Sequence, residues 1–142
     1  MNNKLIAPWE QTKWIVASSS TFLIPSFYAY YKNIYHLSFI SFITFAFSVN
    51  FWRNATYSLR RKIDIINANF AFTIFSLHGF YYINNLLHIL ICYPGFFLSI
   101  YLYQCSLYFF DKKDKNWVYC HVLFHLVMSI EKMFIVYNIS HN

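Results

Sequence analysis

Two histidines, His121 and His125, lie one helical turn apart near the start of a long apolar segment. Residues at positions i and i+4 of a helix face the same way, so one helix can offer two imidazole nitrogens to a single metal ion. Ionisable side chains inside a membrane segment are costly and commonly mark function, so the pair is a candidate metal site. The structural alternative is that both rings hydrogen-bond Ser48, Asn50 or Asn67 on neighbouring helices.

Ser48 and Asp64 are expected near this histidine pair. If the inner ends of their segments lie at Trp52, Asp64 and Trp117, then Ser48 and His121 lie about 6 Å deep and His125 about 12 Å deep. Packing the three segments together would therefore bring all four side chains into one site. Two simpler roles are open: Asp64 as a charge favoured at a helix amino terminus, and Ser48 as a side chain bonded to its own backbone.

Arg60 and Arg61 precede Asp64 in the chain. A guanidinium group binds phosphate through two parallel hydrogen bonds, so these side chains are candidates for contact with a lipid headgroup. Their other interpretation is as basic residues that fix the orientation of the chain in the membrane.

Three further histidines and one charged pair are expected at the opposite, outer side. They are His36, His78 and His88, which could form a second polar cluster or lie separately at the membrane interface. Glu131 and Lys132 also fall toward that side, where an ion pair or snorkelling of the lysine would cost little.

The composition predicts an integral membrane protein. Hydrophobic residues make up 58% of the 142 residues, aromatic residues 24% and charged residues only 11%, whereas about a quarter of a soluble domain is charged. A membrane helix needs about 20 apolar residues, and five segments approach that length: residues 14–31, 35–52, 64–83, 86–110 and 117–137. We therefore expect an all-α, multi-pass bundle that forms a single membrane domain over residues 1–142, in an endomembrane or organelle membrane.

The distribution of basic residues orients this bundle. With five spans, one side collects nine basic residues and the other only Lys32 and Lys132. The nine are Lys4, Lys13, Arg53, Arg60, Arg61, Lys62, Lys112, Lys113 and Lys115. Because cytoplasmic loops accumulate Lys and Arg, the amino terminus should lie inside and the carboxyl terminus outside. The net charge of +6 then suits anionic lipid better than nucleic acid.

Together these residues resemble a family of membrane proteins. Ser48-x-x-x-Trp52, Arg60-Arg61-x-x-Asp64 and His121-x-x-x-His125 are similar to motifs of the alkaline ceramidase, adiponectin/progestin receptor and hemolysin III superfamily. Its members have seven helices, and three histidines hold zinc. Trp52 stands where the family has its third histidine, so a metal ion here would need Asp64, Cys120 or His36 as a substitute ligand.

The resemblance implies a zinc-dependent, ceramidase-like hydrolase that acts on a lipid amide or ester. His121 and His125 would bind zinc, Asp64 would bind or orient the water, and Ser48 would donate a hydrogen bond; zinc lowers the pKa of bound water to about 7. The alternative is a non-catalytic, small multi-pass subunit or scaffold that packs against membrane protein partners. An apolar cavity that is open to the inner leaflet and ends at His121, His125 and Asp64 would favour the first function over the second.

Overall fold

The computed structural model describes residues 4–141, and these residues are almost entirely helical, which confirms the all-α class. The helices are α1 (Trp9–Ser19), η1 (Ser20–Phe22), α2 (Leu23–Tyr31), α3 (Tyr35–Trp52), α4 (Leu59–Tyr82), α5 (Leu86–Asp111) and α6 (Asn116–His141). No β-strand forms in this range; a single bridge joins Leu5 to Thr56. α1, η1 and α2 follow one another without a break, so residues 4–141 form five helical segments.

The tightened turn η1 lies just before Pro25. Proline has no backbone N–H, and its ring clashes with the carbonyl group four residues earlier, here that of Thr21. A short 3₁₀ turn at this point changes the path of the backbone and keeps the helix going past the proline.

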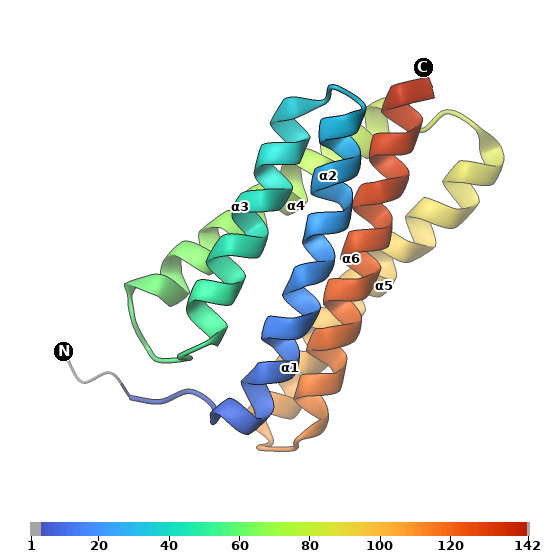
Figure 1. Ribbon diagram of the computed structural model, residues 1–142. Coiled ribbons are helices and arrows are strands. Elements are labelled where there is room, and N and C mark those ends of the chain that lie inside the picture. Colours follow the sequence, from blue (N-terminus) through green and yellow to red (C-terminus); the bar gives the residue numbers. More distant parts are fainter. Residues whose placement is uncertain (1–3, 142) are drawn as a thin grey trace.

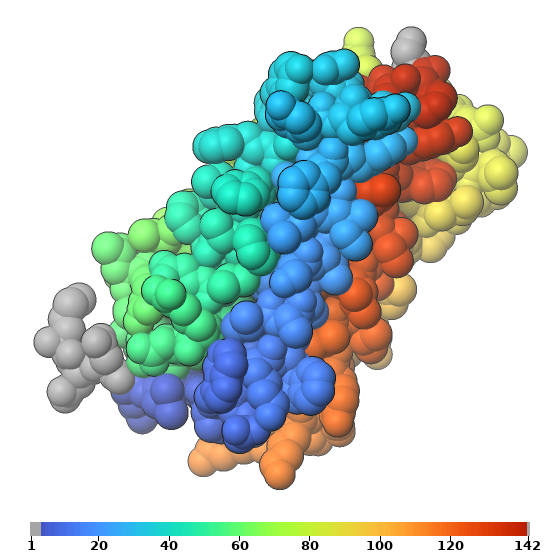
Figure 2. Space-filling view, in the orientation of Figure 1, coloured from blue at the N-terminus to red at the C-terminus, as the bar shows by residue number. Residues whose placement is uncertain are grey.

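The segment α1–α2 lies between α3 and α6 and contacts both along its length (Figure 1). α4 packs mainly on α3, and α5 packs on α6. Figure 2 shows the side chains of α1, α2, α3 and α6 meeting to cover this face of the molecule. Figure 1 shows α4 and α5 behind this layer, diverging toward the lower end.

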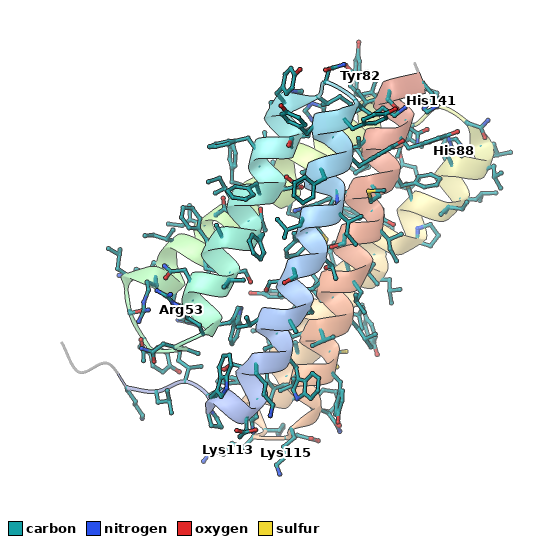
Figure 3. The ribbon with its side chains drawn as sticks, viewed as in Figure 1. Arg53, Tyr82, His88, Lys113, Lys115 and His141 are labelled. Carbon is teal, nitrogen blue, oxygen red and sulfur yellow. The ribbon has the colours of Figure 1, made fainter. Side chains whose placement is uncertain are left out.

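The two ends of the bundle differ in charge. We call inner end the one that holds the amino-terminal segment and the turns at 53–58 and 112–115, and outer end the one that holds the turns at 32–34 and 83–85 and His141. Figure 3 shows Arg53, Lys113 and Lys115 at the inner end, and Tyr82, His88 and His141 at the outer end. Backbone hydrogen bonds from Ile6 to Ala55 (2.8 Å) and from Tyr57 to Lys4 (3.1 Å) tie the amino-terminal segment to the inner turn.

Two of the described helices, α5 and α6, are long and apolar enough to cross a membrane. The predicted five-span arrangement is therefore not confirmed. α4 differs from α5 and α6 because its first turns carry Arg60, Arg61, Lys62 and Asp64. It also begins at Leu59, five residues before the position expected from the sequence, because Ser58 has the extended backbone typical of a residue that precedes a helix.

Candidate functional site

A cavity of about 370 Å³ lies between the inner halves of α3, α4, α5 and α6. Its wall is mostly apolar, with side chains such as Phe51, Ile65, Phe72, Ile100 and Phe124. Small-molecule sites in proteins have volumes of about 300–1,000 Å³, so this space is large enough for a ligand. Phe72 of the cavity wall stacks on Phe96 of α5, with ring centroids 5.0 Å apart.

Five of the six predicted site residues line this single cavity: Ser48, Arg61, Asp64, His121 and His125. Arg60, in the first turn of α4, is not part of the wall. The structure thus brings together residues from α3, α4 and α6 that are far apart in the sequence. Asp64 does not open its helix but lies in the second turn of α4, where the macrodipole stabilises it less.

His125 is buried, with 4% of its surface exposed, and is held by the first helical segment. Its Nδ1 lies 2.9 Å from Ser18 Oγ on α1, and its ring packs on Phe22 with centroids 5.0 Å apart. Ser18 Oγ donates its only proton to the carbonyl oxygen of Ile15, at 3.0 Å. His125 Nδ1–H must therefore donate to Ser18, which leaves His125 Nε2 with a free lone pair.

His121 lies one turn closer to the inner end. Its Nδ1 is 3.2 Å from Ser106 Oγ on α5, and its ring meets the edge of Trp52 with centroids 5.0 Å apart. The His121 and His125 rings are 4.8 Å apart between centroids. Both histidines do hydrogen-bond across helices, but the partners are Ser106 and Ser18 rather than the expected Ser48, Asn50 or Asn67.

Ser48 is buried on α3 and lies 2.8 Å from Ser19 Oγ on α1. Ser19 Oγ donates to the carbonyl oxygen of Ile15 at 2.8 Å, so Ser48 is the donor in the pair of hydroxyl groups. The proton that the resemblance would assign to substrate is thus engaged within the protein, and Ser48 presents acceptor lone pairs to the cavity.

Trp52 stands where the resemblance would place a third histidine, and it also lines the cavity. Its indole N–H is buried and has no hydrogen-bond partner in the described part of the chain. A buried donor without a partner costs about 1–3 kcal/mol, so a ligand that offers an acceptor here would recover that free energy.

Lys132 corrects an expectation from the sequence. It was expected to snorkel or pair with Glu131 at the outer side, but it is 1% exposed and lines the cavity. Its Nζ lies 4.5 Å from the ring centre of Phe22 and 5.0 Å from that of Phe75. Glu131 lies instead toward Gly95 and Cys92 of α5. Within residues 4–141 the recorded salt bridge joins Lys13 to Glu10, far from Lys132.

The described residues do not fit the three-histidine zinc centre that the resemblance implies. Among them, no three His, Cys, Asp or Glu side chains lie close enough to share a metal ion. Trp52 offers no lone pair, and His36, one of the suggested substitutes, contacts His78 instead. Zinc at His121 and His125 stays a prediction of the resemblance.

The chain matches no protein-family model, no curated protein and no solved structure. These comparisons therefore do not test the resemblance to the ceramidase superfamily, and a functional proposal depends on the residues and dimensions of the cavity.

Sequence reasoning missed Ser18, Ser106 and Lys132 as parts of this site. The signal for Ser18 was present, since small hydroxyl residues in an otherwise apolar run often hydrogen-bond a neighbouring helix. No comparable signal existed for Lys132. The sequence gives the depth of a residue along its helix. It does not show which side of α6 faces the interior, because apolar residues occur on all sides of that helix.

Proposed function

We propose that this protein is a membrane protein that binds a single-chain lipid with an anionic end inside the cavity between α3, α4, α5 and α6. The single observation that carries the proposal is Lys132, a buried lysine side chain in the wall of an apolar cavity. The shape of the cavity agrees with a linear ligand. Between Trp117 and Lys132, both in its wall, α6 rises about 22 Å.

A bilayer is the setting that the outer surface of the bundle favours. In the most apolar stretch of α5, only 11% of residues are buried within the protein. Large apolar side chains on other helices are also exposed, among them Phe27 (68%), Phe39 (65%) and Ile66 (69%). Exposed apolar surface of this extent is unfavourable in water and favourable against lipid chains. This supports the predicted five-span, multi-pass arrangement.

The anionic end of the ligand belongs at Lys132. A buried ammonium group without a counter-ion is costly. The faces of Phe22 and Phe75 offset part of that cost through cation–π attraction. A carboxylate entering from the cavity supplies the missing negative charge. The lipid would then bind carboxylate first, with its chain extending toward the inner end.

The test compares two probes of equal chain length, palmitic acid and 1-hexadecanol. Purified wild-type protein in nanodiscs should bind palmitate about tenfold more tightly than the alcohol, which corresponds to about 1.4 kcal/mol. In Lys132→Met the two probes should bind alike, whereas in the control Arg61→Gln the preference for palmitate should persist. If folded wild-type protein binds neither probe, the proposal is wrong. If Arg61→Gln removes the preference and Lys132→Met does not, the carboxylate lies at the inner end.

A second candidate function is the hydrolysis of a lipid amide or ester, as the resemblance implies. The observation that favours it is the unpartnered indole N–H of Trp52, which lies in the same cavity wall as Asp64, His121 and His125. An amide or ester carbonyl oxygen is an acceptor of the kind that this donor lacks. The test is release of fatty acid from a ceramide and from a monoacylglycerol, with and without added zinc. Asp64→Asn should abolish release, and wild-type protein that binds palmitate without releasing it from either substrate contradicts this candidate.

The alternative role, as a non-catalytic subunit of a larger membrane complex, stays a prediction. It is favoured over ligand binding only if the cavity accepts neither probe.

A further inference from the structure

A second histidine pair lies at the outer end, far along the bundle from the cavity site. His36, in the first turn of α3, and His78, in the last turns of α4, bring their Nε2 atoms to 3.3 Å from each other. His36 is exposed and His78 is partly exposed. His36 is one residue from the start of α3 and His78 four residues from the end of α4, so the two nitrogens lie near the outer end of the bundle, where water and ions are available.

The hydrogen bonds of His78 fix which of its nitrogens carries the proton. His78 Nδ1 lies 2.8 Å from the carbonyl oxygen of Ile74, which can only accept. Nδ1 is therefore the protonated nitrogen, and Nε2 directs a lone pair toward His36. Metal-binding histidines commonly show this arrangement, in which the nitrogen that does not bind the metal donates to a backbone carbonyl. The ring of Tyr82 stacks on His78 with centroids 6.1 Å apart and holds its orientation.

We propose that His36 and His78 form a binding site for a divalent transition-metal ion of the zinc, nickel or copper type. Imidazole suits these ions, and zinc bonds imidazole nitrogen at about 2.0–2.1 Å. Two such nitrogens around a tetrahedral ion are about 3.3 Å apart, which is the separation observed here. The ion would lie between the two nitrogens and replace the direct hydrogen bond between the rings.

Water or small anions would complete the coordination. The Asp and Glu residues of the chain lie elsewhere: Glu10, Asp111 and Asp114 are in or beside inner-end segments, Asp64 lines the cavity, and Glu131 faces α5. The site therefore has two protein ligands and open positions, as in zinc sites that bind exogenous groups. A metal ion here would also join the outer ends of α3 and α4, whose only covalent link is the turn at the inner end.

The experiment is a chelator-buffered zinc titration of tag-free, full-length protein, followed by thermal unfolding and by metal content after gel filtration. Wild-type protein should bind about one zinc ion per chain and unfold at a higher temperature when zinc is present. His78→Ala and His36→Gln should each weaken binding at least about tenfold. His36→Gln is the sharper variant, because its amide can still donate a hydrogen bond to His78 Nε2, so stability without zinc should be kept while the zinc-induced shift is lost.

His88→Ala is the matched control, since His88 is another histidine of the outer end and its Nδ1 lies 2.7 Å from Asn138 Oδ1. It should bind zinc as wild type does. The double variant His121→Ala/His125→Ala should also keep the site, provided that circular dichroism shows it to be folded. The proposal is overturned if wild-type protein shows no zinc-induced shift. It is equally overturned if zinc binding by the folded His121→Ala/His125→Ala variant survives the addition of His78→Ala, or if zinc binding is lost with His121 and His125 and not with His36.

Discussion

The two histidine pairs of this bundle differ in how they are built. The inner pair, His121 and His125, comes from one helix and is surrounded by side chains of other helices, with each Nδ1 facing a serine hydroxyl. The outer pair, His36 and His78, comes from two helices and lies near the outer end of the bundle, with its Nε2 atoms facing each other. The spacing His-x-x-x-His in the sequence marks the first pair. The separation expected for two ligands of one metal ion is seen in the second. Sequence spacing along one helix is thus a weaker guide to a metal site than the convergence of two helices.

The largest expected difference between the two pairs is in the loss of stability when one histidine is replaced, because His125 is buried and His36 is exposed. His125→Ala removes a ring packed on Phe22 and leaves a cavity, so it should lower the free energy of unfolding by about 2–5 kcal/mol. His36→Ala changes an exposed side chain and should shift it by no more than about 0.5 kcal/mol without added metal. Thermal unfolding of both variants in the same detergent measures the contrast. Equal losses would mean that the outer pair is as structurally important as the inner one.

Lys132 adds a second difference between the inner and outer sites. In the proposed function, this side chain gives the inner site a role in ligand binding in addition to its role in packing. Lys132→Met replaces a buried lysine, which forms no salt bridge within residues 4–141, with an apolar side chain of similar length. Replacing a buried ion pair by apolar side chains is often neutral or stabilising by about 1–4 kcal/mol, and we expect the replacement of a buried lysine without an acidic partner to act in the same direction. We therefore expect a higher unfolding temperature together with loss of the preference for palmitate. A destabilised variant that keeps this preference would show that Lys132 has a structural role that the cation–π contacts do not account for.

The sequence predicted the helices better than the directions of their side chains. Long apolar runs gave the all-α class, and the basic residues from Arg53 to Lys62 and from Lys112 to Lys115 marked turns at one end. The structure places one cavity beside Ser48, Asp64, His121 and His125. The sequence could predict this grouping, because the helix rise gives the depth of each residue along the bundle. The rotational orientation of α6 could not be predicted in this way, so the sequence placed Lys132 at the surface. The contact between His36 and His78 also depends on how α3 and α4 pack, which spacing does not determine.

Trp52→His tests whether the inner pair lacks only a third ligand in order to bind zinc. The substitution places a third imidazole on α3, where the indole ring now lies 5.0 Å from the ring of His121. If the backbone is already suited to three ligands, the variant should gain a second zinc ion per chain, with affinity at the inner site raised about tenfold or more. Metal analysis after gel filtration measures the gain, and adding His78→Ala removes the contribution of the outer pair. A folded variant that gains no zinc would show that the inner histidines are arranged for hydrogen bonding and not for coordination.

The smallest effect is expected at Ser48. Its hydroxyl donates to Ser19, a pairing between helices whose net contribution is about 0.6 kcal/mol in membrane proteins. Ser48→Ala should therefore lower stability by less than about 1 kcal/mol and leave palmitate binding unchanged. Ser19→Ala is the matched control, because it breaks the same pair from α1, outside the cavity wall. If Ser48→Ala abolishes release of fatty acid from a ceramide while Ser19→Ala does not, the Ser48 hydroxyl acts on substrate, and the inner histidines belong to a catalytic site rather than to the wall of a lipid-binding cavity.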